Sequence, residues 1–390
     1  MEPEKKVRGS FPSLHYIRML GCAVSLTLGA LLSACTVAPG MRMSEPAKLP
    51  LSSGGAEGQK MEMQIPISDI DLALIKKMQE AAATISAGQS QVLMGKPSAY
   101  TLGNGDVLQV IVWDHPELAA ATGAQPQTNG RISDPIQGFV IDNDGNVQLP
   151  YSGSVHVAGL QIDQAQQKIY KEFSRVFVKP QVTVRVASFR SQQVYVDGEV
   201  HTPGAVPIND IAMNLYEAIN RAGGFSPTAD QGRMVLVREG TSYPLNLTRM
   251  LELGENPASI VLKSGDLLRI MSRDESGVFV MGEVNRPVTA IPMKSGKLTL
   301  SDALSQAGSL NTGSADAAQL FIVRGSLDTE PKVFHLDAHS PVSMVLANQF
   351  ELQPKDIVYV DGNGLVRFNR VLSLLLPAIN AGLTTAIVTK

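Results

Sequence analysis

The sequence predicts an α+β chain of several domains that ends in an amphipathic helix, and three observations support this fold class. A pattern of strand, turn and helix occurs twice between residues 190 and 361. Short strands and one helix in a different order precede these repeats, between residues 97 and 189. The last segment, residues 363–390, is mostly apolar and has no acidic residue. A chain of 390 residues is long enough for several small domains with separate cores.

Residues 1–34 have the pattern of a secretion signal, with a basic region before the uncharged apolar run Met19 to Leu31. Leu32-Ser33-Ala34-Cys35 follows this run and resembles the bacterial lipobox, in which the cysteine is acylated and becomes the first mature residue. We therefore expect Cys35 to carry lipid, including palmitate. Thr36 in the next position implies sorting to the outer membrane. The alternative is an ordinary signal peptide with a cysteine near its cleavage site.

Charge and cysteine content limit the possible partners and the sources of stability. The formal net charge is −3, and the signal carries more basic than acidic residues, so the mature chain is more acidic still. This argues against nucleic acid as a partner, and against an anionic membrane surface as the main one. Of the two cysteines, Cys22 leaves with the signal and Cys35 would carry lipid. No disulfide is then available, so the domains depend on their own cores.

Residues 35–96 are expected to form the lipidated N-terminus, a tether and a short helix. Residues 36–64 are rich in Pro, Gly, Ser and Met without periodicity, which indicates a tether. Ile70 to Ile85 has apolar residues at helical spacing, and Ser68 or Asp69 could cap this helix.

Residues 97–189 predict an α+β domain. Its elements are a strand at Val107 to Trp113, a hairpin over 140–149, a helix over 162–177 and a strand over 182–186. The hairpin is predicted because Asn and Gly in Asp142-Asn143-Asp144-Gly145-Asn146 tolerate the positive φ of a tight turn. The same turn does not fit a calcium-binding EF-hand loop, which requires Gly at the sixth position, where Val147 stands.

Residues 190–272 and 277–361 are two copies of one pattern. The segment 194–200, Val-Tyr-Val-Asp-Gly-Glu-Val, recurs at 278–284 as Val-Phe-Val-Met-Gly-Glu-Val. Arg238 corresponds to Arg324, and Asp266 corresponds to Asp356. The offset between the copies grows slowly along the chain, so insertions fall in loops and we expect both copies to share one fold.

Residues 363–390 are predicted to form a membrane-spanning amphipathic helix. At 1.5 Å per residue, the stretch from Leu365 to Ile387 would reach roughly 35 Å, enough to cross a bilayer core. Polar residues fall on one stripe, and a ring of such helices would enclose water and face lipid outside. The expected pore-lining residues are Arg370, Ser373, Asn380 and Thr384. The expected lipid-facing residues are Phe368, Leu372, Leu375, Ile379 and Leu383. The alternative is a buried helix that packs on a soluble core.

We expect no enzymatic activity, no metal and no cofactor. His335 and His339 are four residues apart, but their surroundings alternate like a strand and Pro341 follows, so a metal site is not favoured. Asp114 and Glu117 would act as a glycosidase pair only at a defined separation, and a turn explains them more simply. Only 5% of residues are aromatic, so the chain is poor in the aromatic platforms that glycan-processing or tightly glycan-binding sites usually offer.

Several motifs together resemble the outer-membrane polysaccharide export lipoproteins of the Wza type, the capsule translocons. The resemblance covers nearly the whole mature chain. The motifs are the lipobox at Cys35, Gly103-Asn104-Gly105-Asp106-Val107-Leu108, Val112-Trp113-Asp114-His115-Pro116-Glu117-Leu118, Phe189-Arg190-Ser191-Gln192, Val278-Phe279-Val280-Met281-Gly282-Glu283-Val284, Gln353-Pro354-Lys355-Asp356-Ile357-Val358-Tyr359-Val360, and Val366-Arg367-Phe368-Asn369-Arg370 before Leu376-Pro377. Phe368 is a departure, because this family often has tryptophan there.

The resemblance implies a fold, a location and partners. A polysaccharide export domain would occupy residues 97–189, and two β-grasp-like SLBB repeats would occupy 190–272 and 277–361. The C-terminal helices of a homo-oligomer, an octamer, would form an α-helical barrel. The protein would be lipid-anchored in the cell outer membrane, with most of the chain in the periplasm. Its partners would be outer-membrane lipid, an exported capsular or exopolysaccharide chain, and an inner-membrane polysaccharide co-polymerase with a tyrosine kinase domain.

Two other functions remain open at the level of sequence. The main alternative is a periplasmic scaffold lipoprotein that binds glycan or a partner without forming a pore. An outer-membrane glycan hydrolase is a third, weaker possibility. Truncation after Gly362 separates the first two, because a scaffold would stay functional and a translocon would lose export.

Overall fold

The computed structural model describes residues 40–51, 61–113, 115, 138–326, 329–374 and 376. Internal contacts divide the chain into two compact units. One unit holds Lys76–Ser276 and Ile291–Leu298. The other holds Gly277–Ala290 and the residues from Thr299 onward, together with the N-terminal residues up to Ile75. The predicted signal segment, Cys35, Asp114 and Glu117 lie outside the described residues.

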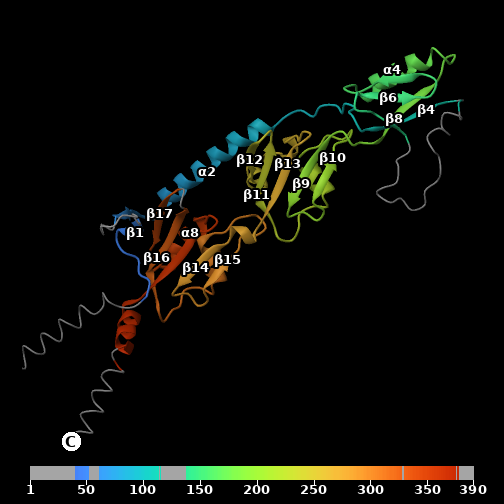
Figure 1. Ribbon diagram of the computed structural model, residues 1–390. Helices are drawn as coiled ribbons and strands as arrows, with labels where there is room; N and C mark the ends of the chain where they lie inside the picture. Colours follow the sequence, from blue (N-terminus) through green and yellow to red (C-terminus); the bar gives the residue numbers. More distant parts are fainter. Residues whose placement is uncertain are drawn as a thin grey trace, which may run out of the picture. The chain divides into compact units, whose positions relative to one another are not determined.

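The export-domain region folds as a small α+β domain, in which α4 lies against the sheet (Figure 1). One antiparallel sheet has the order β5-β4-β8, and β6 pairs with β7 in a second, two-stranded sheet. The helix buries Ala165, Ile169 and Phe173 on one face, as its amphipathic sequence requires. The elements are β4 (Val107–Val112), β5 (Phe139–Val140), β6 (Asn146–Leu149), β7 (Gly153–His156), α4 (Ile162–Phe173) and β8 (Val182–Ser188).

Two sequence predictions in this domain are wrong in detail. The hairpin expected over 140–149 is reduced to one bridge between Ile141 and Val147, and the regular ladder joins β6 to β7 instead. The Asp142 carboxylate accepts hydrogen bonds from the backbone N–H groups of Asp144 and Asn146 and so replaces ladder bonds there. The expected helix over 162–177 ends at Phe173.

The buried carboxylate of Asp106 joins two motifs that are far apart in sequence. It is fully buried and accepts hydrogen bonds from the Tyr100 hydroxyl at 2.7 Å and the Gly103 N–H at 3.0 Å. The N–H groups of Arg190 and Ser191 also donate to it, at 2.8 and 2.9 Å. A buried carboxylate needs such donors, so Asp106 fixes the point where the chain leaves this domain for the first repeat.

The first repeat is a five-stranded sheet with the order β10-β9-β13-β11-β12. Strands β9 and β13 are parallel, and the other neighbours are antiparallel. Helices α5 and α6 contribute Leu215, Ile219 and Met250 to its core. The elements are β9 (Gln193–Gly198), β10 (Gly204–Pro207), α5 (Leu215–Arg221), β11 (Ala229–Arg238), β12 (Thr241–Leu245), α6 (Leu247–Glu252), η2 (Pro257–Ser259), β13 (Leu267–Ser272) and η3 (Asp274–Ser276).

The second repeat has the same strand order, β15-β14-β18-β16-β17, and one added edge strand, β3. The expectation that both copies share one fold is therefore confirmed. Its elements are β14 (Val278–Gly282), β15 (Val288–Ala290), α7 (Leu300–Gln306), β16 (Ala315–Ser326), β17 (Thr329–Leu336), η4 (Pro341–Ser343), α8 (Met344–Gln349) and β18 (Ile357–Gly362), with β3 at Ile67–Asp69.

The repeated glycine before the glutamate is required by the backbone. Gly198 and Gly282 have φ values of +85° and +92°. A Cβ at Gly198 would lie 2.0 Å from the Ile270 carbonyl oxygen, and one at Gly282 would lie 2.1 Å from that of Val360. Any side chain at either position would therefore push the two parallel strands apart.

Each repeat also contains one buried arginine–aspartate pair in the corresponding place. Nη2 of Arg238 lies 2.6 Å from Asp266 Oδ2, and Nη2 of Arg324 lies 2.7 Å from Asp356 Oδ2. In both pairs Nε also donates to the carboxylate, so the contact is bidentate. Both aspartates are almost completely buried, at 2% and 1% side-chain exposure.

The N-terminal segment is more ordered than the tether that its composition predicts. Strand β1 (Ala47–Leu51) pairs with β2 (Met61–Ile65), and the side chains of Ala47 and Ile65 form a second small core on the outer face of the repeat-2 sheet. Helix α2 is longer than expected, at Leu72–Leu93. Asp71 accepts a hydrogen bond from the Leu74 N–H at 2.7 Å, whereas the expected cap Asp69 lies in β3.

Sequence differences explain why only the second repeat is covered in this way. Its outer face presents Phe321, Tyr359 and Val333, which pack against the hairpin. The register places Val235, Arg269 and Ser242 at the corresponding points of the first repeat. Arg269 and Ser242 are exposed in the first repeat, where charged and hydroxyl side chains do not need a cover.

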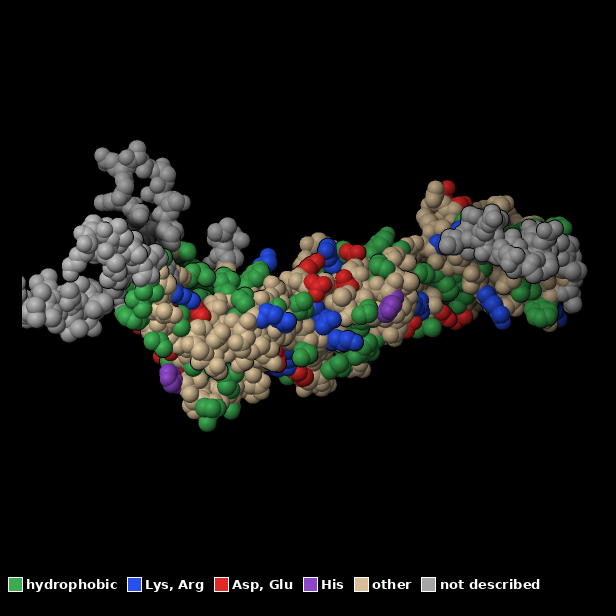
Figure 2. Space-filling view, turned by 90° about the horizontal axis from the view of Figure 1, so that it is seen from below, with side chains coloured by type: hydrophobic (Ala, Val, Ile, Leu, Met, Phe, Trp, Pro, Cys, Tyr) green, Lys and Arg blue, Asp and Glu red, His purple; other side chains and the backbone are tan. Residues whose placement is uncertain are grey.

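The surface and the helices complete the description. Figure 2 shows acidic and basic side chains interspersed over one face, in keeping with the small net charge. Within the part of the chain that the structure describes, no helix combines the length and the apolar character needed to span a membrane.

We predict that breaking the Arg324–Asp356 pair destabilises the protein by about 3–5 kcal/mol, because Asp356→Ala leaves a buried guanidinium without its partner. The double variant Arg324→Met/Asp356→Leu should recover most of this loss. Urea unfolding of the purified full chain measures both. The control is Asp197→Ala, which removes an exposed pair 4.0 Å long with Arg269 and should cost less than about 1 kcal/mol. Equal losses for both single variants would contradict the assignment.

We also predict a pH-dependent contact between β3 and β17. Nδ1 of His335 lies 2.7 Å from Asp69 Oδ1, and Nε2 lies 2.7 Å from the Ala318 carbonyl oxygen. Only a protonated ring donates from both nitrogens. Burial lowers the pKa of His335, but the hydrogen bonds to Asp69 and Ala318 and the charges of Asp69 and Glu45 outweigh burial, so the pKa is raised above 6.5.

Because folding raises the pKa of His335, the contact contributes its full stabilisation below pH 6.5. This stabilisation is lost as pH rises through the folded-state pKa of His335. The stability difference between wild type and His335→Gln should therefore be larger near pH 5.5 than near pH 8.5. Equilibrium unfolding at both values measures it. A difference that is the same at both pH values, or larger at the higher one, would refute this contact.

Candidate functional site

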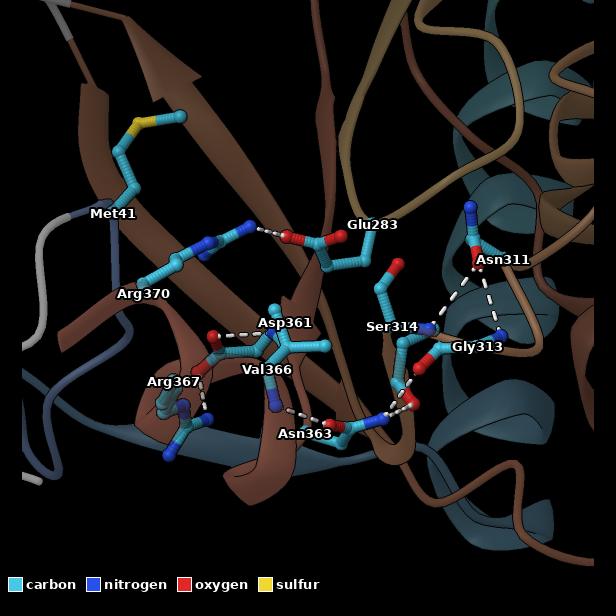
Figure 3. Close-up of polar contacts among 12 residues, drawn as sticks. Met41, Glu283, Asn311, Gly313, Ser314, Asp361, Asn363, Val366, Arg367 and Arg370 are labelled. Atoms are coloured by element: carbon cyan, nitrogen blue, oxygen red, sulfur yellow. Dashed lines mark hydrogen bonds and ion pairs between the residues drawn. The ribbon is translucent and has the colours of Figure 1, made fainter. Parts of the chain in front are cut away.

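The described start of the C-terminal helix is fastened to the second repeat by polar contacts (Figure 3). Residues 364–374 are helical and directly follow strand β18. Asn363 caps this helix, because its Oδ1 accepts a hydrogen bond from the Val366 N–H at 2.9 Å. Its own N–H donates to the Ser314 carbonyl at 2.8 Å, and its side-chain amide donates to the Gly313 carbonyl at 3.2 Å. The cap therefore connects the helix to the loop before β16.

A buried ion pair lies one turn further along. Nη2 of Arg367 is 2.9 Å from Asp361 Oδ2, and the Asp361 side chain is only 6% exposed. Tyr359 donates its hydroxyl hydrogen to the Met41 carbonyl, which brings the N-terminal segment to the same place. Burial first, and then the neighbouring Asp361 carboxylate, raise the pKa of Tyr359 to about 12. The tyrosine therefore stays a neutral donor.

A second ion pair joins Arg370 to Glu283, the glutamate of the repeated Gly-Glu-Val motif. Burial raises the pKa of Glu283, but the Ser314 hydroxyl and the Arg370 guanidinium more than offset burial, so the pKa is lowered. The Ser314 hydroxyl lies beside the carboxylate without the geometry of a full hydrogen bond. Glu283 is therefore an anion that faces the helix.

The three contacts lie on one face of the helix. Asn363, Arg367 and Arg370 are spaced by four and three residues, so at about 100° per residue they fall within one narrow sector. Phe368 and Leu372 fall on roughly the opposite side. Phe368 is 41% exposed, as expected for a side chain that points away from the repeat. We call the contacts of Asn363, Arg367 and Arg370 the root contacts. They fix the rotation of the helix about its own axis.

The structure places only some of the residues that the sequence singled out. Arg370 turns to Glu283, and the Ser373 hydroxyl donates to the Arg370 carbonyl one turn back, at 2.9 Å. Phe368 and Leu372 are partly or largely exposed. Their roles in lining a pore or facing lipid remain predictions. The lipidation site and the other helix positions lie outside the described residues: Cys35, Leu375, Ile379, Asn380, Leu383 and Thr384.

Sequence reasoning did not identify Asp361, Asn363 and Glu283 as the base of the helix. One local signal was available, since an asparagine before a helical period is a common N-cap. Glu283 and Arg370 lie 87 residues apart, so no local pattern predicts their ion pair, whereas Asp361 and Arg367 are close in sequence. The repeat offers a partial guide: the Arg273 N–H donates to the Thr228 carbonyl at 3.0 Å, which corresponds to the bond from Asn363 to Ser314.

The site is suited to holding a helix. Asp361 and Arg367 also border a pocket of about 580 Å³ that Arg42, Glu45, Asp316 and Gln319 line. Among the described residues, no group of three or more His, Cys, Asp or Glu side chains could hold a metal. His335, one of the two histidines considered for a metal, is engaged with Asp69 and Ala318.

Comparison with known sequences identifies the domains. The sequence profile described as polysaccharide biosynthesis/export protein matches residues 94–187. The profile of the SLBB domain matches residues 192–270 and 276–360. These matches correspond to the α+β domain and to the two repeats with shared strand order.

Relatives are similar over nearly their full length. The chain is 39% identical to the EPS I polysaccharide export outer membrane protein EpsA of Ralstonia solanacearum, over 98% of this chain and 99% of that protein. It is 24% identical to the capsule polysaccharide export protein BexD of Haemophilus influenzae, over 91% and 93% of the two chains. It is 25% identical to the capsule polysaccharide export outer membrane protein CtrA of Neisseria meningitidis, over 95% and 97%.

We predict that Arg367→Met loosens the start of the helix, because the variant leaves Asp361 buried without its cation. Amide hydrogen exchange in residues 364–374 should become about tenfold faster, as for the loss of a charged hydrogen bond. Mass spectrometry of the detergent-purified full chain measures this exchange. Asn369→Ala is the matched control, because that side chain is exposed on the same helix. Similar exchange in both variants would show that the ion pair does not hold the helix.

Proposed function

Because this chain belongs to the polysaccharide export family of outer membrane proteins, we propose that it is a translocon for capsular or exopolysaccharide. In this proposal a homo-oligomeric ring, an octamer by family resemblance, encloses a water-filled lumen. The C-terminal helices form an α-helical barrel in the outer membrane, and the polymer passes through it. In this proposal the protein itself does not catalyse a reaction.

The attachment of the C-terminal helix is the observation that supports a pore most directly. A helix in a barrel must present its polar stripe to the lumen and its apolar side to lipid. The root contacts at Asn363, Arg367 and Arg370 hold the helix in one rotation relative to the second repeat, with Phe368 and Leu372 on the other side, and a single rotation is what a barrel requires. A helix tethered by a flexible linker could turn either side inward.

The location follows from the family and from the N-terminus. Relatives of this length are named as outer membrane proteins, and the chain is assigned to the outer membrane. We propose that Cys35 is acylated and anchors the N-terminus there, with residues 97–361 in the periplasm. The ordered N-terminal hairpin supports this arrangement, because it brings the segment after Cys35 close to the base of the helix.

The partners in this proposal supply the polymer and the energy. The names of the relatives refer to exopolysaccharide and capsule, so a bacterial polysaccharide is the proposed cargo. An inner-membrane polysaccharide co-polymerase with a tyrosine kinase domain is the proposed periplasmic partner. The export protein itself would act passively, as a selective conduit.

Cysteine modification in living cells tests the pore. We predict that Ser373→Cys and Thr384→Cys react with a bulky water-soluble maleimide, and that this modification reduces polysaccharide export at least tenfold. Leu372→Cys and Leu375→Cys are the matched controls from the proposed lipid-facing side. They should react slowly, because lipid excludes the reagent, and export should be unchanged.

A chain that ends at Gly362 gives the baseline for lost export. It should retain its periplasmic fold, because β18, the last strand of the second repeat, ends at Gly362. Equal reaction at both sets of cysteines, or normal export by the truncated chain, would refute the barrel. The second result would favour a scaffold without a pore.

A further inference from the structure

A pocket of about 360 Å³ lies beside the first repeat and has no assigned role. One wall is the segment 93–101, which leads from α2 into the export domain, and the others include Ile208, Asn209, Ala212, Met213 and residues 261–264. All of these residues belong to one compact unit. The volume falls in the range of small-molecule sites, about 300–1,000 Å³. It is far larger than the roughly 30 Å³ of a water molecule, so the pocket suits a small organic molecule better than a bare ion.

The wall formed by residues 93–101 is held in place. Leu93 is buried in the core of the first repeat, and Met94 forms a β-bridge with Ile260. The Gly95 N–H donates to the Ser259 carbonyl at 3.2 Å. At the other end of the wall, the Gln192 side-chain amide donates to the Thr101 carbonyl at 2.9 Å. Because both ends are fixed, the pocket exists before any ligand arrives.

The lining is positively charged. Lys96, Arg238 and Lys263 line the pocket, and none of its lining residues is Asp or Glu. Arg238 is 12% exposed and is oriented from behind by Asp266, which receives its Nε and Nη2 hydrogens. No described residue accepts a hydrogen bond from Nη1 of Arg238. Because Asp266 already pairs with Arg238, the net positive charge of the lining comes from Lys96 and Lys263, and this charge favours a carboxylate or phosphate ligand.

Neutral polar groups make up much of the remaining lining. Hydroxyl and amide side chains both donate and accept hydrogen bonds, which matches the many hydroxyl groups of a sugar. They are Ser98, Thr101, Gln192, Asn209 and Ser264. A site for a bare phosphate would not need this variety of partners over such a volume.

We propose that this pocket binds an anionic saccharide, one or two sugar residues that carry a carboxylate. The negative charge follows from the lining alone, whereas the choice of a saccharide rests on the proposed function in polysaccharide export. Such a site would let the protein distinguish an acidic polymer from a neutral one. It is separate from the polar stripe of the C-terminal helix.

Calorimetric titration of the purified full chain in detergent tests the site with D-glucuronate, D-glucose and inorganic phosphate. We expect glucuronate to bind at least tenfold more tightly than either glucose or phosphate. The double variant Lys96→Gln/Lys263→Gln should weaken glucuronate binding at least tenfold, because both exposed ammonium groups are removed. Lys171→Gln on α4 is the matched control and should leave binding unchanged.

Each of the following outcomes would overturn the proposal. Phosphate that binds as tightly as glucuronate would make the pocket a simple anion site. Glucose that binds as tightly would remove the role of charge, and unchanged affinity in the double variant would place any binding elsewhere. These results are distinguishable from failure of the proposed function, because export is measured in cells and binding on the purified protein. Normal export without glucuronate binding would reject this pocket alone.

Discussion

Compensation of buried carboxylates is the constraint on which the arrangement of this chain depends. Asp106, Asp266, Asp356 and Asp361 are all at most 4% exposed. A buried anion is tolerated only when donors surround it, so Asp106, Asp266 and Asp356 each draw together segments that are far apart in sequence. Asp106 joins the export domain to the first repeat, Asp266 and Asp356 secure equivalent loops, and Asp361 holds the helix. The motifs that carry the family resemblance are largely these aspartates and their partners.

The sequence was sufficient to predict the fold where the pattern is local or repeated. The shared strand order of the two repeats follows from their self-similarity, and the position of β4 follows from its apolar run. Reasoning from sequence failed for the N-terminal hairpin, because β1 and β2 are short and acquire their core only from Phe321, Val333 and Tyr359 of a distant sheet. A comparison of the two repeats contained this information, since Tyr359 stands where the first repeat has Arg269.

The candidate site was partly predictable for the same reason. Helical period and polarity identify Arg370 and Ser373 from sequence alone, because both properties are local. The partner of Arg370 is Glu283, which lies on the loop after β14 and could be recognised only in three dimensions. In the first repeat the corresponding Glu199 instead receives the hydroxyl hydrogens of Ser226 and Thr228. One motif therefore serves two structural purposes, and the sequence of the motif does not distinguish them.

The geometry at the root of the helix has a consequence for the segment beyond it. An α-helix transmits rotation along its axis, because each residue is fixed relative to the one before it at about 100°. Because Asn363, Arg367 and Arg370 are held, the directions of the side chains in residues 364–374 are set relative to the second repeat. In the proposed barrel, polar groups of the second repeat would then determine which face of the helix is turned inward. In the proposed ring, the repeats would determine which side of each helix meets the lumen, and lipid would only have to accept the opposite side.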